Sequence, residues 1–154
     1  MKKVKITTEK ALTVFNVLKG AAYQKLSDED KVKVWKAYRT LHPVATKFKE
    51  DSRDAAEKLK PEGMEATLEK AKEYEQKKAK GDTDLPMTEQ EYKEFINGDW
   101  AKFNQLLSKA VKEFADTEVE VEFEPINEDG FSKLMASNNW TMEQVLIVSE
   151  FITE

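Results

Sequence analysis

The sequence has no cysteine, one histidine, five glycines and four prolines among its 154 residues. Without cysteine, disulfides, thiolate nucleophiles and Cys-ligated zinc are excluded. A single histidine excludes the paired-histidine motifs of zinc enzymes. The few glycines leave little material for a Gly-rich loop that could hold a phosphate. Most metal-dependent and nucleotide-dependent enzyme classes are therefore disfavoured.

Long apolar runs are also missing. No stretch reaches the roughly 18 apolar residues that a membrane-spanning helix needs, and no apolar segment follows the basic start Met1–Lys5. We expect a soluble, cytoplasmic protein without a membrane partner.

Charge is abundant and unevenly distributed. Charged residues make up 36% of the chain, and the net charge is −5. Residues 1–60 carry 15 Lys and Arg against 8 Asp and Glu, whereas residues 61–154 carry 10 against 22. Such a composition favours elongated helices with solvated faces. The asymmetry predicts that the two halves either fold together or associate with other copies.

A heptad-like pattern runs from residue 34 to residue 59. Its apolar or small positions follow one another in steps of four and three residues, which is the spacing of one helix face. These positions are Val34, Tyr38, Leu41, Ala45, Phe48, Ser52, Ala55 and Leu59. Pro43 interrupts the pattern without changing its phase, so we predict a kinked but continuous helix.

The best partner for this helix is a predicted helix over 99–115. Its apolar stripe comprises Phe103, Leu106, Leu107, Ala110, Val111 and Phe114. We expect Leu41 and Phe48 to be buried against it in an antiparallel pair. Phe48→Ala should then cost about 3–5 kcal/mol of stability.

Start signals predict the remaining helices. Thr8 begins a helix over 8–22, Ser27 caps the long helix, and capping boxes begin at Thr88 and Thr141. Asn97–Asp99 is interpreted as a break. The fold class is therefore mainly α, an antiparallel helical bundle with a small β ribbon. We expect one domain over 1–154, in which 61–86 form a solvated helical arm and loop.

Two alternating segments predict a two-stranded ribbon. Val119, Val121 and Phe123 alternate with four glutamates, and Val4 and Ile6 alternate with lysines. The candidate interaction residues are Glu118, Glu120, Glu122, Glu124, Lys3 and Lys5. The lysines could lie opposite the glutamates across the ribbon. Alternatively, acids about 6.5–7 Å apart along a strand could imitate the phosphates of DNA.

No constellation predicts catalysis, and we expect neither enzyme activity, a cofactor nor a metal. Asp28–Asp30 open a helix and suit its dipole better than a metal ion. His42 precedes a proline and is interpreted as structural. Lysines and arginines along the long helix form a solvated face, so direct nucleic-acid binding is not expected.

The chain resembles a family of small, uncharacterised helical proteins encoded by tailed phages and prophages. The resemblance covers most of the chain except 61–86, and its most specific part is the strand region Thr117–Ile126. The other matching features are Tyr23-Gln24-Lys25-Leu26, the Leu41–Leu59 helix with its proline, Glu91-Tyr92 with Phe95, and Gln105-Leu106-Leu107. The resemblance implies an accessory protein in the cytoplasm of the host cell and brings no catalytic residues.

These observations favour a non-catalytic interaction or assembly-accessory protein that self-associates. We expect a homo-oligomer, in which the acidic ribbon of one copy meets the Lys-rich half of another. A host or phage protein is a further possible partner. The alternative is a phage counter-defence protein that acts as an inhibitor, a DNA mimic or a nucleotide-sequestering sponge.

Overall fold

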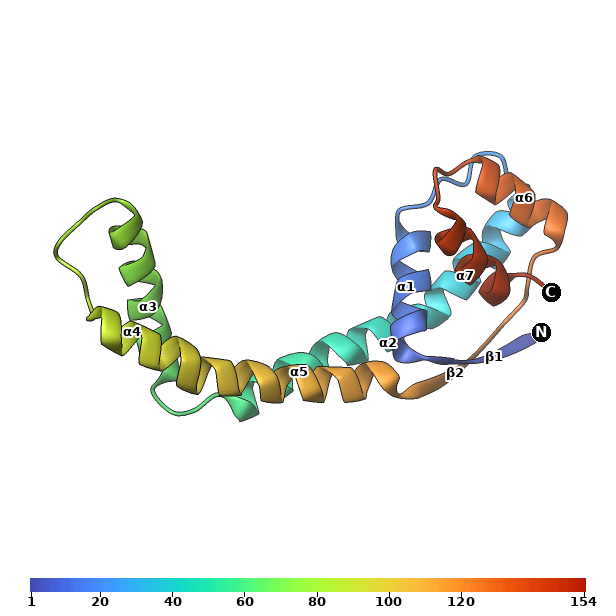
Figure 1. Ribbon diagram of the computed structural model, residues 1–154. Helices are drawn as coiled ribbons and strands as arrows, with labels where there is room; N and C mark the ends of the chain where they lie inside the picture. Colours follow the sequence, from blue (N-terminus) through green and yellow to red (C-terminus); the bar gives the residue numbers. More distant parts are fainter. The chain divides into compact units, whose positions relative to one another are not determined.

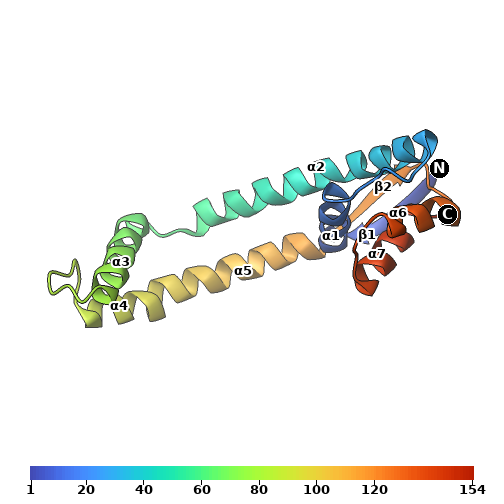
Figure 2. The same ribbon diagram turned by 90° about the horizontal axis from the view of Figure 1, so that it is seen from above.

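The computed structural model describes all residues from 1 to 154 and is mainly α-helical, with one small antiparallel sheet (Figures 1 and 2). The predicted fold class, mainly α with a small two-stranded β ribbon, is thereby confirmed. In chain order the elements are β1 (Lys2–Thr7), α1 (Thr8–Lys19), α2 (Asp28–Leu59), α3 (Met64–Ala79), α4 (Glu89–Phe95), the π-helical turn η1 (Ile96–Trp100), α5 (Ala101–Asp116), β2 (Glu118–Phe123), α6 (Glu128–Ala136) and α7 (Met142–Ile152).

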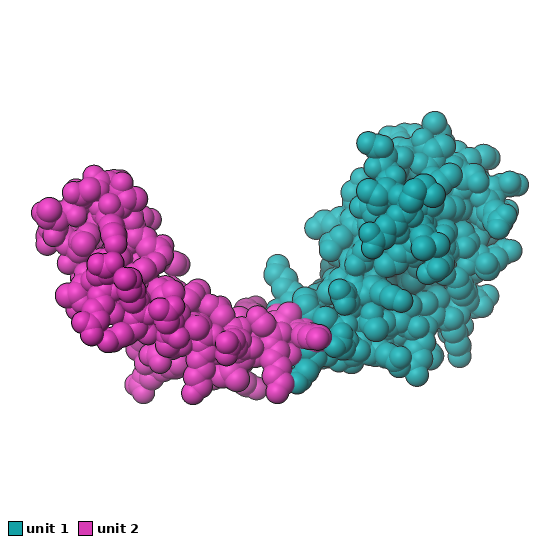
Figure 3. All heavy atoms as spheres, in the orientation of Figure 1, with its two compact units in different colours: residues 1–51, 113–154 teal, residues 52–112 magenta.

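The chain divides into two compact units (Figure 3). Unit 1 combines Met1–Asp51 with Glu113–Glu154, and unit 2 is Ser52–Lys112. Both α2 and α5 contribute residues to each unit. The division does not coincide with the expected arm over 61–86, and the single-domain organisation stays a prediction.

Unit 1 has the larger hydrophobic core. Helices α1, α2, α6 and α7 and strand β2 all contribute to it, and α7 packs on α1 (Figures 1 and 2). Its most buried large side chains are Leu18, Leu41, Ile126, Leu134 and Ile152. Within this unit, residues 1–51 carry 12 Lys and Arg against 6 Asp and Glu, and residues 113–154 carry 1 against 11. Unit 1 thus combines a basic segment with an acidic one, and Lys5–Glu118 and Lys33–Glu124 are ion pairs between them.

The two strands pair in the predicted manner. They run antiparallel, with Lys3 opposite Glu122, Lys5 opposite Glu120 and Val4 opposite Val121. Side chains alternate between the faces of a strand, so this register gathers the valines on the core side and the charges on the other. Two hydrogen bonds connect the sheet to the C-terminal end of the chain. The Lys2 Nζ donates to the carbonyl oxygens of Glu150 and Thr153, each at 2.7 Å.

Helix α2 is continuous through Pro43, as predicted. Its apolar face, however, is buried at some positions and borders a cavity at others. Val34 and Leu41 lie in the core of unit 1, and Leu41 has no exposed surface. The expectation that Leu41 packs on the 99–115 helix is therefore wrong. The reason is that α1, α6 and α7 supply a broader apolar surface than one helix can. Phe48 is only half-buried, although it does lie with Phe114 around one cavity.

Unit 2 has a separate, smaller core. It comprises Met64, Ala71, Tyr74, Met87, Phe95 and Phe103, with Ala56, Leu59 and Leu107 packed against it. The Tyr74 ring of α3 stacks on Tyr92 of α4 with ring centroids 4.6 Å apart. The buried side chains of α3 thus hold this helix against α4 and α5, although 61–86 were expected to form a solvated arm and loop.

The expected break at Asn97–Asp99 is absent. These residues form the turn η1, and helical backbone continues from α4 through η1 into α5. A π-helical turn accommodates an extra residue without ending the helix. The rings on either side keep it in place, because Trp100 packs on both Phe95 and Phe103. Packing therefore overrides the turn tendency of Asn and Gly.

The predicted capping signals mostly hold. Complete capping boxes are present at Thr88 and Thr141, and the Asp30 N–H donates to Ser27 Oγ at 3.2 Å. Helix α1 differs, because its N-cap is Thr7 and it ends at Lys19, before Gly20. Thr8 instead turns inward, where its hydroxyl donates to the carbonyl oxygen of Thr117 at 2.8 Å.

The connection between α3 and α4 should be the first site of proteolysis. Residues 80–84 are exposed, and Gly81 adopts a positive φ of 78° outside any helix. Proteases prefer such exposed connections. Limited trypsin digestion should therefore cut first after Lys78 or Lys80. Replacing both lysines with glutamine should delay the first cut, and first cuts within 100–123 would contradict the prediction.

Candidate protein-binding sites

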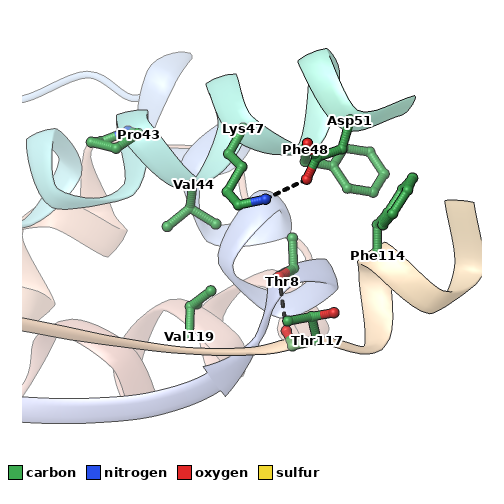
Figure 4. Close-up of a pocket in the computed structure, with 9 residues that line it drawn as sticks. All are labelled: Thr8, Pro43, Val44, Lys47, Phe48, Asp51, Phe114, Thr117 and Val119. Carbon is green, nitrogen blue, oxygen red and sulfur yellow. Dashed lines mark hydrogen bonds and ion pairs between the residues drawn. The ribbon is translucent and has the colours of Figure 1, made fainter. Parts of the chain in front are cut away.

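The first candidate site is an apolar cavity in unit 1, which we call the Phe48 pocket (Figure 4). It has a volume of about 340 Å³. Helix α2 forms one wall, and the end of α5, the start of β2 and the start of α1 form the others. The Phe48 and Phe114 rings face each other from α2 and α5 (Figure 4). The lining residues are Thr8, Pro43, Val44, Lys47, Phe48, Asp51, Phe114, Thr117 and Val119.

The polar groups of the Phe48 pocket are already engaged. The Thr8 hydroxyl donates to the Thr117 carbonyl oxygen at 2.8 Å, and the Thr117 hydroxyl donates to the Glu113 carbonyl oxygen at 3.0 Å. Lys47 forms an ion pair with Asp51 one helical turn later. A nucleophile needs an adjacent base that can take its proton, and neither hydroxyl has one. The pocket suits an apolar side chain better than a reaction.

The second candidate site, the Trp35 pocket, lies between the end of α1, the following loop and α2 in unit 1. Its volume is about 310 Å³, and its lining residues are Leu18, Lys19, Tyr23, Lys31, Trp35 and Tyr38. Lys31, Trp35 and Tyr38 are spaced to share one face of α2. The cavity therefore combines three aromatic side chains with two cationic ones.

The aromatic walls of the Trp35 pocket are held in position by other contacts. Tyr38 stacks on Phe15 with ring centroids 4.9 Å apart and planes at 5°. The Tyr23 hydroxyl donates to the Leu18 carbonyl oxygen. Burial, with a smaller effect from Tyr38, raises the pKa of Tyr23, so this hydroxyl keeps its proton near neutral pH. Arg39 lies 5.3 Å from the Trp35 ring centroid, a cation–π contact.

A third feature is the outer face of α7. Met142 is 80% exposed and Leu146 is 59% exposed, although the opposite face of the helix buries Val148, Phe151 and Ile152. Glu150 is exposed and follows Leu146 by one turn, so Met142, Leu146 and Glu150 share a stripe. We call this stripe the α7 face. It combines apolar side chains with an acidic one.

The six residues predicted for interaction all lie on the ribbon or directly after it. Lys3, Lys5, Glu118, Glu120, Glu122 and Glu124 are exposed. Lys5 Nζ lies 3.2 Å from a carboxylate oxygen of Glu118, and Lys33 Nζ lies 3.5 Å from one of Glu124. The register places Glu120 and Glu122 opposite lysines. The structure thus brings five of the six residues onto one ribbon, where Lys5 and Glu118 form an ion pair, and Glu124 follows the ribbon and pairs with Lys33.

Lys33 connects α2 to the end of β2. It lies 3.3 Å from a carboxylate oxygen of Glu29 as well as 3.5 Å from one of Glu124. The hydrogen bond with Glu29 is the main cause that raises the pKa of Lys33, with Glu124 contributing. Lys33 therefore remains charged and compensates the last glutamate of the acidic row.

The residues considered for a metal do not gather. No three His, Cys, Asp or Glu side chains form a group that could hold a metal ion. His42 is exposed on α2, where it lies edge-on to Phe15 with ring centroids 6.1 Å apart. Asp28 and Glu29 instead contact lysines of their own helix, Lys31 and Lys33.

Comparisons with known proteins leave the site without a precedent: no family, no curated protein and no solved structure matches the chain. None of the helices combines the length and the apolar composition that crossing a bilayer requires.

Sequence reasoning missed both pockets and the α7 face. Trp35 directly follows Val34 of the heptad-like pattern, and 53% of it is exposed. Its neighbours did carry a signal, because Lys31, Lys36 and Arg39 surround it along the helix. A tryptophan among cations is more typical of a surface than of a core. The Phe48 pocket had no comparable local signal, since distant segments form it.

Proposed function

We propose that the protein is a non-catalytic interaction protein that self-associates. The observation that supports this most is the exposure of large apolar side chains in pairs at helical spacing on unit 1. Val32 and Trp35 are 49% and 53% exposed on α2, and Met142 and Leu146 are 80% and 59% exposed on α7. Single exposed apolar residues are common, but clustered ones are typical of interaction surfaces.

The case against catalysis is chemical. A general acid or base must reach a substrate with a suitable pKa. The only histidine lies outside both pockets, and the polar groups of the Phe48 pocket are paired with each other or with backbone. We therefore propose that binding, and not turnover, is the activity. On the resemblance alone, we propose that the protein is an accessory protein of tailed-phage origin in the host cytoplasm.

The counter-defence alternative has less support. A DNA mimic needs a row of uncompensated negative charges. In the ribbon, Glu118 and Glu124 contact lysines, and Glu120 and Glu122 lie opposite lysines. The charge pattern of this surface is therefore mixed rather than phosphate-like.

Light scattering across a range of salt concentrations tests the proposal. At micromolar protein and 0.1 M salt we expect a homo-oligomer, most simply a dimer. The contact should weaken toward 1 M salt, because the Debye length falls from about 10 Å to about 3 Å and exposed charges are screened. A monomer at low salt would overturn the proposed self-association.

Ribbon variants test whether the glutamates of β2, or another surface, determine self-association. Glu120→Lys with Glu122→Lys places like charges opposite Lys5 and Lys3 within the chain, so a loss of association could reflect a damaged sheet. The matched control adds Lys3→Glu and Lys5→Glu, which restores opposite charges at these two directly opposed positions but removes the ion pair of Lys5 with Glu118. If this fourfold variant associates like the wild type, the charge arrangement of the ribbon does not determine assembly.

A further inference from the structure

We propose that the Trp35 pocket of one copy receives the α7 face of a second copy. This inference rests on the proposed self-association and assigns its two surfaces. Both surfaces belong to unit 1, so each copy carries one receptor and one donor. The occupant of the pocket is thus a segment of the same chain in another molecule.

The receptor is preformed. The stack of Tyr38 on Phe15, the Tyr23 hydrogen bond and the Arg39 contact with Trp35 each fix one aromatic wall. A cavity that is already ordered loses little conformational freedom when a partner enters. Large aromatic side chains with an exposed face are also the residues that most often dominate binding energy at interfaces.

The receptor is also basic. Lys19 and Lys31 line it, and Lys36 and Arg39 are exposed on the same helix as Trp35. The ion pair of Lys31 with Asp28 is long, at 3.9 Å, and Asp28 is exposed. Lys19 and Lys31, the two cations that line the pocket, therefore remain available to an acidic partner.

The donor has the opposite charge. Helix α7 contains Glu143 and Glu150 and no basic residue. Lys2 of β1 lies beside Glu150, so Glu143 is the acid of α7 that a partner's cations can meet. Met142 and Leu146 supply the apolar part of the stripe, and methionine adapts its shape to an irregular cavity. Because the inner face of α7 is fixed by Phe151 and Ile152, the stripe is presented on a rigid helix. Apolar and charged groups of the donor thus match those of the receptor.

The Phe48 pocket is a poorer receptor for the same donor. Its only lining cation, Lys47, is already paired with Asp51. The nearby chain around its Phe114 and Thr117 walls includes Glu113, Asp116 and Glu118. These acids would repel the glutamates of α7, and like charges across an interface oppose a wrong pairing. Electrostatics therefore selects the Trp35 pocket.

Two single variants and a mixture test this assignment by light scattering at 0.1 M salt. Leu146→Glu alters the donor and Trp35→Glu alters the receptor. Both residues are more than half exposed, so the variants should keep the wild-type circular dichroism. Each should weaken self-association at least about tenfold, as expected for a central contact. Leu106→Glu is the matched control, because Leu106 is 43% exposed in unit 2 and should leave association unchanged.

The mixture gives the sharper result. The Trp35→Glu protein retains an intact α7 face, and the Leu146→Glu protein retains an intact pocket. Mixed together, they should form a one-to-one heterodimer at concentrations at which neither variant alone associates. In addition, Glu143→Lys should weaken self-association. Mixing the Glu143→Lys protein with a Lys19→Glu/Lys31→Glu double variant should restore association, because opposite charges then face each other again.

The outcomes separate the two proposals. If the wild type associates and both variants associate equally well, self-association stands and the assignment of these surfaces is overturned. If both variants weaken association but their mixture stays monomeric, the two surfaces do not contact each other and the assignment is again overturned. A monomeric wild type at 0.1 M salt overturns both proposals.

Discussion

Leu41→Ala should lower the free energy of unfolding by about 2–5 kcal/mol. Leu41 has no exposed surface and lies in the core of unit 1. Alanine would remove its buried methyl groups and leave a cavity that the surrounding helices α1, α6 and α7 cannot fill without moving. Urea denaturation monitored by circular dichroism measures the loss.

Phe48→Ala is the informative comparison. From its half-burial, we expect a loss of about 1–2 kcal/mol, which is smaller than the cost expected for a fully buried seam residue. A loss for Phe48→Ala equal to or larger than that for Leu41→Ala would contradict the placement of the two residues. The same ranking should persist at high salt, because neither effect depends on charge.

Phe103→Ala should destabilise unit 2 by about 3–5 kcal/mol. Phe103 is the only buried residue of α5, and it packs with Trp100 at a ring-centroid distance of 5.9 Å. Most of the other apolar residues of α5 are partly or well exposed, so the helix has little else to hold it in this core. Truncation of this ring should therefore affect the whole unit.

Hydrogen exchange can show which residues lose amide protection in Phe103→Ala. Separate cores allow separate opening, since cooperative units of a protein can unfold with different free energies. In Phe103→Ala, amide protection should fall across residues 64–112 and remain near the wild-type value in α1 and α6. A uniform loss of protection over the whole chain would show that the two units unfold as one.

Local signals predicted a large part of the fold. The ribbon could be predicted with its two faces, because alternation fixes which residues share a face. Its register could not, because a shift of two residues would still place Lys3 and Lys5 opposite glutamates and valine opposite valine. The capping boxes at Thr88 and Thr141 also succeeded, because each involves only four consecutive residues. Short-range patterns of this kind need no knowledge of the tertiary structure.

Two expectations failed where tertiary packing decides. The heptad pattern predicted that α2 is buried on one side along its length, but it could not show that Val34 and Leu41 would meet several helices while Phe48 would border a cavity. At Asn97–Asp99 the local tendency to turn was real, yet the packing of Trp100 between Phe95 and Phe103 keeps the backbone helical.

The candidate sites show the same limit. Sequence reasoning selected charged residues on the ribbon, and the structure places lysines opposite glutamates there. The Phe48 pocket unites residues from positions 8, 48 and 114, and no spacing rule connects them. The Trp35 pocket was more accessible to prediction, because half of its lining lies on one face of α2. Exposure of an aromatic residue, however, is a property of the fold.

The discontinuity of unit 1 has a consequence for chain architecture. Residues 52–112 leave unit 1 after Asp51 and return at Glu113, and Asp51 and Phe114 line the same cavity. The two ends of the excursion are thus neighbours, as in a domain inserted into a surface loop of a host. Closing a short loop costs little entropy, so a few flexible residues could replace the excursion and leave the host fold intact. Unit 2 is a contiguous stretch of chain, whereas unit 1 needs segments from both ends of the sequence and can be complete only after residues 113–154 have been made.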